Sequence, residues 1–175
     1  MAFSQATHFS RECPGKYSKV KLAFVFVGGH KEAWLIELSD SYQKKLNFYF
    51  KTEILRVKPA QIARDTAGLK QKQECQAILN HIQPQDFVVL CDERGKSFNS
   101  KKFSEQIVSW VENQKSRIVF VIGGAFGSSE ELKKRANFQL SLSEFTFNHH
   151  LAQVLILEQM YRAISIWKNL PYHND

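Results

Sequence analysis

The chain has 175 residues, of which 43% are hydrophobic and 23% charged, and its formal net charge is +7. This length fits one domain that buries roughly 68–70% of its unfolded surface, and no apolar run approaches the ~20 residues that cross a bilayer. Three cysteines without a CxxC pair exclude an obvious disulfide or zinc framework. With no signal-peptide pattern at the start, we expect a cytoplasmic protein without a membrane partner. The dispersed Lys and Arg residues favour contact with polyanions, although solubility alone also explains them.

Residues 1–20 are polar, contain a Pro-Gly pair and lack periodicity, which predicts a flexible N-terminal extension. Residues 21–175 are expected to form a single domain. The apolar segments predict strands at Lys21–Val27, Thr52–Val57, Asp86–Cys91, Arg117–Ile122 and Phe138–Phe147.

Helical periodicity alternates with these strands. Helices are predicted around Trp34–Tyr49, around Cys75–Ile82, around Phe103–Val111, from the Ser128/Glu131 capping-box pair, and over Leu151–Trp167. Strands that alternate with helices predict an α/β fold, with a mostly parallel sheet covered by helices on both faces.

Ligands of open α/β sheets bind outside the carboxyl ends of the strands. Four predicted loops lie there: Gly28–His30, Asp92–Lys96, Gly123–Gly127 and Asn148–His150. The glycines allow close approach of a ligand, but they are equally consistent with simple turns. Neither a Walker sequence nor GxGxxG, HExxH or GxSxG is present, and no third ligand completes a zinc spacing with His149 and His150. The residue patterns alone therefore predict a basic α/β domain with a glycine-lined cleft.

The carboxyl-terminal half resembles a known family in several motifs that occur in order. The motifs are Asp92-Glu93-Arg94-Gly95-Lys96, Val121-Ile122-Gly123-Gly124 with Gly127, Leu140-Ser141-Leu142-Ser143, Phe145-Thr146-Phe147 with His149, and Glu158 through Tyr161-Arg162-Ala163 to Pro171-Tyr172-His173. With these residues the chain resembles the ribosomal RNA large-subunit methyltransferase H family of the SPOUT superfamily.

The resemblance implies an α/β fold with a C-terminal trefoil knot. It also implies a homodimer that transfers a methyl group from S-adenosyl-L-methionine to N3 of a pseudouridine in large-subunit (23S) ribosomal RNA, either as free RNA or in the assembled ribosome. The cofactor is expected at the knot, and the RNA site is expected to be shared between subunits.

Matched by position, the cofactor-binding residues are Cys91, Gly124 and the run Ser143, Glu144, Phe145, Thr146, Phe147 and Asn148. One of the two phenylalanines is expected to serve only core packing. The catalytic candidates are Tyr172, which positions the target ring, His173, which assists proton removal, and Arg162, which orients a phosphate or the tail. A frayed terminus is the alternative for Tyr172 and His173.

Two segments depart from the family pattern. Gly123–Gly127 has Ala125-Phe126 where many relatives have Pro-Glu, and Asn148–Gln153 replaces Pro-His-Pro-Leu-Val-Arg, so that Gln153 stands in place of an arginine. The competing hypothesis is therefore a non-catalytic RNA- or ribosome-binding protein that kept the fold and lost the cofactor.

Overall fold

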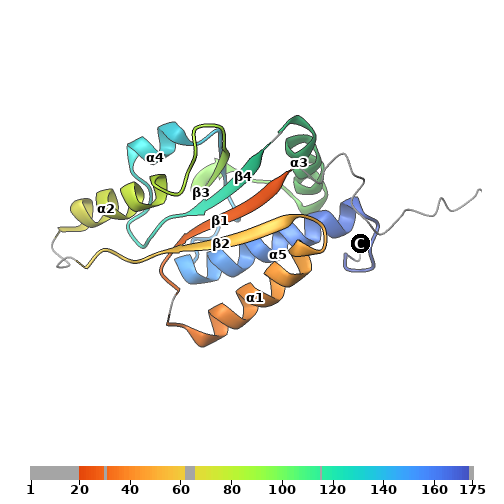
Figure 1. Ribbon diagram of the computed structural model, residues 1–175, viewed down its shortest axis with the longest axis horizontal. Coiled ribbons are helices and arrows are strands. Elements are labelled where there is room, and N and C mark those ends of the chain that lie inside the picture. The colour runs from red at the N-terminus through yellow and green to blue at the C-terminus, as the bar shows by residue number, and fades with distance from the viewer. Residues whose placement is uncertain (1–19, 30, 62–65, 115, 174–175) are drawn as a thin grey trace, which may run out of the picture.

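The computed structural model describes residues 20–29, 31–61, 66–114 and 116–173. The strands are β1 (Lys21–Val27), β2 (Lys51–Val57), β3 (Phe87–Lys96), β4 (Arg117–Ile122) and β5 (Phe138–Leu140). The helices are α1 (Ala33–Asn47), α2 (Ala67–Leu79), α3 (Ser100–Asn113), α4 (Glu130–Arg135) and α5 (His149–Trp167). All strand pairs are parallel, in the order β2-β1-β4-β3-β5 (Figure 1). This confirms the predicted parallel α/β sheet; the knot stays a prediction.

The helices form two layers, one on each face of the sheet, because successive side chains of β1 point to opposite faces. Phe24 and Phe26 pack with α3 and α5, whereas Val25 and Val27 pack on the side of α2 and α4. Helix α1 lies beside α5 on the first side (Figure 1). All of β1 after its first residue is buried, so both layers are anchored on a strand without a solvent face.

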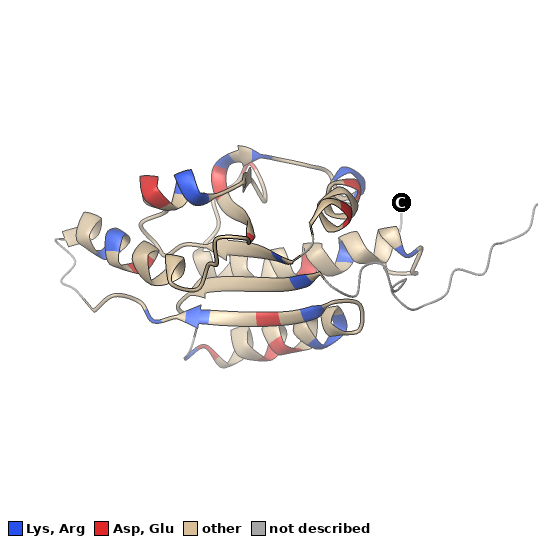
Figure 2. Cartoon of the chain, turned by 45° about the horizontal axis from the view of Figure 1, so that its top comes forward, with Lys and Arg blue, Asp and Glu red and all other residues tan. Residues whose placement is uncertain are grey.

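Charged residues lie mainly on the helices and towards the edges of the sheet (Figure 2). Among the described residues, no helix has both the length and the apolar character that spanning a membrane requires. Helix α5 is the most apolar, and its Ile156, Leu157 and Met160 are fully buried in the core. The apolar pattern of this helix therefore reflects packing within the chain.

Strands β3 and β5 differ from their predicted lengths. The sequence predicts a strand over Phe138–Phe147, but pairing stops at Leu140, so residues 141–148 are free to take an irregular path. Conversely, β3 continues through the predicted loop Asp92–Lys96, with a register shift between Cys91 and Lys96. Gly95 makes this possible, because a Cβ there would lie 2.6 Å from the backbone carbons of Gln139 and Leu140.

Two helix starts also differ from prediction. The Oγ of Ser129, rather than that of Ser128, caps α4 by accepting a hydrogen bond from the Leu132 N–H at 3.3 Å. Helix α5 begins at His149 and not at Leu151, since the Oδ1 of Asn148 caps it by accepting from the His150 N–H at 2.8 Å. The predicted extension over residues 1–20 lies outside the described residues except for Val20, which is buried in the core.

Candidate functional site

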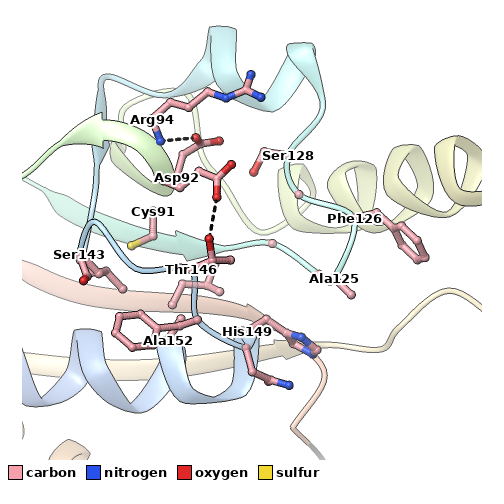
Figure 3. Close-up of a pocket in the computed structure, with 18 of the residues that line it drawn as sticks. Cys91, Asp92, Arg94, Ala125, Phe126, Ser128, Ser143, Thr146, His149 and Ala152 are labelled. Carbon is pink, nitrogen blue, oxygen red and sulfur yellow. Dashed lines mark hydrogen bonds between the residues drawn. The ribbon is translucent and has the colours of Figure 1, made fainter.

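A cavity of about 590 Å³ opens at the carboxyl edge of the sheet. Its walls come from the end of β3, from the turn after β4, from residues 142–148 and from the first turn of α5. Figure 3 shows these segments around one space, with Cys91 from β3, Thr146 from the irregular segment after β5 and Ala125 from the turn after β4. The position agrees with the site expected for an open parallel sheet.

The cavity gathers most of the residues that the sequence assigns to a cofactor. Cys91, Gly124, Ser143, Phe145, Thr146, Phe147 and Asn148 line it, whereas Glu144 does not. Phe145 is 81% exposed and Phe147 is 40% exposed, so neither ring packs in the core of the described chain. The expectation that one of them serves core packing is therefore wrong, because β5 ends before reaching them.

The turn after β4 is built so that its backbone is the surface of the cavity. Gly127 has a φ of +73°, and its N–H donates to the carbonyl of Gly124 at 3.1 Å. Behind the turn, a Cβ on Gly124 would collide with the carboxylate of the buried Glu74. The Nε2 of Gln71 donates to the Phe126 carbonyl at 2.7 Å and fixes the outer side of the turn. Glycine is therefore required at position 124 by close packing.

The segment after β5 uses its polar side chains to hold its own shape. The Oγ of Ser141 donates to the Ser143 carbonyl at 2.9 Å, and the Oγ of Ser143 accepts from the Phe145 N–H at 3.0 Å. The Oγ1 of Thr146 donates to Glu93 at 3.3 Å, which ties the segment to β3 (Figure 3). Most of this surface is thus shaped by short local hydrogen bonds.

Two titratable groups of the cavity are held in their neutral forms. Burial, followed by the charge of Asp92, raises the pKa of Cys91 to about 12, so its thiol is not a nucleophile at neutral pH. Burial, followed by the charge of His150, lowers the pKa of His149. The carboxylates of Asp92 and Glu93 also line the cavity. Arg94 and Lys133 line it too, so the charged groups of the cavity are two carboxylates and two cations, beside a neutral thiol and a neutral imidazole.

These features fit a sulfonium donor such as S-adenosylmethionine. The volume lies within the ~300–1,000 Å³ of small-molecule sites. Ile122, Leu142 and Ala152 supply apolar wall, and the glycine turn supplies accessible backbone. Asp92 and Glu93 bring negative charge to the lining, and Arg94 and Lys133 bring positive charge, so that both the sulfonium and the carboxylate of such a donor find an opposite charge. Among the described residues, no group of three or more His, Cys, Asp or Glu side chains could hold a metal ion.

The three catalytic candidates meet in a second cluster, around the carboxylate of Glu158. Its Oε1 accepts from Arg162 Nη2 at 2.6 Å and Nε at 3.0 Å, and from the Tyr172 hydroxyl at 3.1 Å. Arg162 Nη1 lies 3.3 Å from Nδ1 of His173. Burial, followed by a hydrogen bond with Tyr42, raises the pKa of Tyr172, which keeps its phenol protonated. The terminal residues through His173 are therefore held in place.

A turn at the end of α5 directs the tail back to this cluster. Asn169 has a φ of +52°, the Leu170 N–H donates to the Ser165 carbonyl at 2.9 Å, and the Asn169 N–H donates to Ile166 at 3.1 Å. This pattern is the Schellman motif, in which a left-handed residue ends the helix and reverses the chain. The reversal places Tyr172 against Tyr161, with ring centroids 4.8 Å apart.

The cofactor cavity and the tail cluster lie at different positions along α5. His149 and Ala152 in its first turn line the cavity, whereas the cluster is centred on Glu158, the middle residue of the helix. The rise from Ala152 to Glu158 is about 9 Å along the helix axis. Arg162, Tyr172 and His173 are not among the residues that line the cavity.

Several residues of the site carried no recognisable signal in the sequence. Gln71 belongs to a polar helix, and Glu74 would be expected on a solvent face, yet both support the Gly123–Gly127 turn. Gln153, a departure from the family pattern, is fully buried outside the cavity lining. Its Nε2 donates to the Val27 carbonyl at 2.9 Å, and its Oε1 accepts from Arg56 at 2.8 Å. This departure therefore leaves the cavity wall intact.

An all-parallel sheet with a glycine-lined cavity at its carboxyl edge defines an α/β ligand-binding domain. A family model described as "Predicted SPOUT methyltransferase" matches residues 20–173, and the chain belongs to this family. It is 43% identical over 144 residues to a protein of Bdellovibrio bacteriovorus named ribosomal RNA large subunit methyltransferase H, covering 82% of this chain and 92% of that protein. A protein of the same name from Parabacteroides distasonis is 33% identical over 157 residues, covering 89% of this chain and all of that protein.

Solved structures share the fold at low sequence identity. A probable methyltransferase from Bordetella pertussis Tohama I superimposes with a TM-score of 0.50 at 8% identity, covering 85% of this chain and 96% of the other. A probable methylase family protein from Haemophilus influenzae Rd KW20 gives a TM-score of 0.50 at 11% identity, with coverages of 87% and 67%.

Proposed function

We propose that this protein is a homodimeric, S-adenosylmethionine-dependent methyltransferase that methylates N3 of a pseudouridine in large-subunit ribosomal RNA. The observation that carries the proposal is the convergence of the Gly123–Gly127 turn and residues 142–148 on one cavity. Membership of the SPOUT family and relatives named as ribosomal RNA methyltransferases support the same activity.

The donor supplies an electrophilic methyl group on a positively charged sulfur. The chain's own contribution is mostly positioning, because an in-line transfer gains most from holding the two reacting atoms in place. The Gly124 backbone and the apolar wall hold the donor, with Asp92 and Glu93 available to its positive sulfur and Arg94 and Lys133 available to its carboxylate. The neutral Cys91 thiol does not compete for the methyl group.

The acceptor nitrogen must lose its proton, and the tail cluster offers polar groups for that step. A guanidinium only donates hydrogen bonds, so Nδ1 of His173 accepts from Arg162 and the neutral ring carries its proton on Nε2. In this arrangement His173 stabilises negative charge on the deprotonated base, and it accepts a proton when the bond to Arg162 opens. The Tyr172 hydroxyl, kept protonated, donates its one proton to Glu158, which fixes the ring so that its face and its oxygen lone pair can orient the base.

A second subunit can bring these two regions together. Within one chain the cluster around Glu158 lies about 9 Å further along α5 than Ala152, and Arg162, Tyr172 and His173 do not line the cavity. A dimer that sets the tail of one subunit at the cavity of the other closes this gap. Each composite site then takes its donor pocket from one chain and its Tyr172-His173 pair from the other.

Mixing two inactive variants tests the composite site. Gly124→Val destroys the pocket, and deletion of residues 171–175 removes the tail while leaving donor binding largely intact. In randomly mixed dimers, half of the molecules carry both variants and each of these has one intact site, so about a quarter of the wild-type turnover should return. If pocket and tail act within one chain, mixing restores nothing.

The competing function is RNA or ribosome binding without methyl transfer, and it is favoured by the Ala125-Phe126 and Asn148-His149-His150 departures. Calorimetry with S-adenosylmethionine and S-adenosylhomocysteine distinguishes the two, because the non-catalytic protein shows no saturable binding. Mapping methylated positions in ribosomal RNA from a strain lacking this protein then identifies the nucleotide. Loss of a methyl group from a residue other than a pseudouridine would contradict the proposed target.

A further inference from the structure

A second cavity, of about 650 Å³, borders the carboxyl-terminal tail. Its floor and walls come from the end of α1, from α5 and from residues 170–172. The residues that matter here are Lys44, Lys45, Phe48, Tyr49, Tyr161 and Tyr172. Tyr172 therefore belongs to both the tail cluster and this second cavity. Its hydroxyl donates a hydrogen bond to Glu158, and the residue also lines the cavity.

The charge of this cavity differs from that of the cofactor cavity. Among the described residues that line it, the charged ones are Lys44 and Lys45, whereas in the cofactor cavity Arg94 and Lys133 are balanced by Asp92 and Glu93. The Lys45 ammonium lies 4.9 Å from the ring centroid of Tyr42 and 5.4 Å from that of Tyr161. Figure 2 shows the basic end of α1, which follows an acidic stretch in the middle of the helix. The cavity therefore attracts an anion.

The cavity also presents aromatic surface to solvent. Phe48 is 64% exposed, and its ring meets that of Tyr49 edge-on with centroids 4.9 Å apart. Exposed aromatic rings beside cations are the features by which proteins hold unpaired nucleotides, because bases stack on the rings and phosphates pair with the cations. A two-fold contact between copies centred here would instead bring four lysines together.

We propose that this cavity binds one nucleotide of single-stranded RNA next to the target base, with its base on Phe48 and its phosphates at Lys44 and Lys45. The inference rests on the proposed function, because it takes Tyr172 as a residue that touches the target base. A volume of about 650 Å³ falls in the ~300–1,000 Å³ range of small-ligand sites and has room for a single nucleotide. The site extends recognition from the target base to its neighbour in the RNA strand.

Binding of a fluorescein-labelled, 12-nucleotide single-stranded RNA to the full-length protein, followed by anisotropy, tests the site. Phe48→Leu removes the ring but keeps an apolar side chain, and we expect about tenfold weaker binding. The double variant Lys44→Ala/Lys45→Ala should bind more weakly and lower the slope of log affinity against log salt by about 1.4, or ~0.7 for each lost phosphate contact.

Matched controls separate a site from general charge. Lys101→Ala/Lys102→Ala removes two adjacent exposed lysines from the first turn of α3, outside both cavities, and should change the affinity less than twofold. Leu69→Ala removes a half-exposed apolar side chain from α2 and should also have little effect. Equal losses in the two double-lysine variants, or wild-type affinity in Phe48→Leu, would overturn the proposal.

Light scattering and donor calorimetry on the same preparations complete the test. If Phe48→Leu or the Lys44/Lys45 variant changes the oligomeric state, the surface is a contact between copies and the nucleotide site is refuted. If the wild type binds no S-adenosylmethionine while both variants still lose RNA affinity, the methyltransferase proposal fails and the nucleotide site stands. If donor binding and methyl transfer are normal but RNA affinity is unchanged, only the nucleotide site fails.

Discussion

The start and the middle of α5 carry regions that are built in opposite ways. The cofactor cavity at the start of the helix is shaped by backbone: a glycine turn, a short strand that stops at Leu140, and polar side chains bonded to nearby main chain. The tail cluster beside the middle of the helix depends on side chains that converge on one carboxylate oxygen of Glu158. The cavity should therefore be sensitive to added volume, and the tail to loss of a single charge.

The largest effect is expected from added volume at Gly124. Gly124→Val places side-chain atoms against the buried carboxylate of Glu74, so the turn must move and donor affinity should fall at least about 100-fold, with loss of turnover. Calorimetry with S-adenosylmethionine measures this.

Gly68 provides a matched control, since a Cβ there meets nothing within 4 Å and the residue lies in α2. Gly68→Ala should leave donor binding unchanged and raise the free energy of unfolding by up to about 1 kcal/mol. Tight donor binding by Gly124→Val would show that the turn is not part of the pocket.

Loss of charge at Glu158 should affect turnover and spare donor binding. Glu158→Gln replaces the carboxylate that holds Arg162 and Tyr172, so we expect turnover to fall about tenfold or more and the free energy of unfolding to fall by ~1 kcal/mol. Steady-state methylation assays measure turnover, and calorimetry measures donor affinity. Glu130→Gln breaks an exposed pair with Lys133 and should change neither quantity. Equal losses of donor affinity and turnover would place Glu158 at the pocket.

Much of the fold follows from local sequence patterns. The run Lys21–Val27 is buried on both faces and appears in the sequence as continuous apolar residues, so its range and its burial agree with prediction. The predicted strand boundaries are wrong where contacts between distant segments determine where a strand ends. Asp92–Lys96 looks like a polar loop, but Gly95 lets it pack against the backbone of β5. Phe138–Phe147 looks like a long strand, yet pairing ends at Leu140.

The site was predictable only in part, and for a similar reason. Motif matching identifies residues such as Gly124, in the turn after β4, and Thr146, in the segment after β5. It says nothing of Gln71 and Glu74, because polar residues on a helix give no sign of the turn they support. Motif order also places Tyr172 in the same site as Gly124, whereas Tyr172 bonds to Glu158 and does not line the cavity of its own chain.

A smaller effect is expected at the turn that directs the tail. Asn169 adopts a positive φ, which asparagine tolerates better than alanine does. Asn169→Ala should lower the free energy of unfolding by about 1 kcal/mol and reduce turnover severalfold, while Asn169→Gly should keep both near wild type. Urea denaturation and methylation assays measure these changes. Equal behaviour of the two variants would show that the Schellman turn does not position the tail.

The smallest effect is a pH dependence at the cavity end of α5. Burial lowers the pKa of His149 from its ordinary value near 6.5, and the neighbouring His150 and Lys70 act in the same direction. In the unfolded chain His149 therefore takes up its proton at a higher pH than in the folded chain. Folding stability from this group is fully present above pH 6.5 and is lost as pH falls through the lower folded pKa.

Nuclear magnetic resonance titration of the His149 imidazole, together with urea denaturation between pH 7.5 and 5, checks this sign. Wild-type stability should decline on acidification more steeply than that of His149→Gln, which cannot be protonated. A His149 midpoint above 6.5 would mean that a carboxylate such as Glu32 outweighs burial there, and that the cavity favours a cation at this position. A midpoint below 6.5 would mean that positive charge is disfavoured next to His149. The positive sulfur of a donor would then have to bind near Asp92 and Glu93.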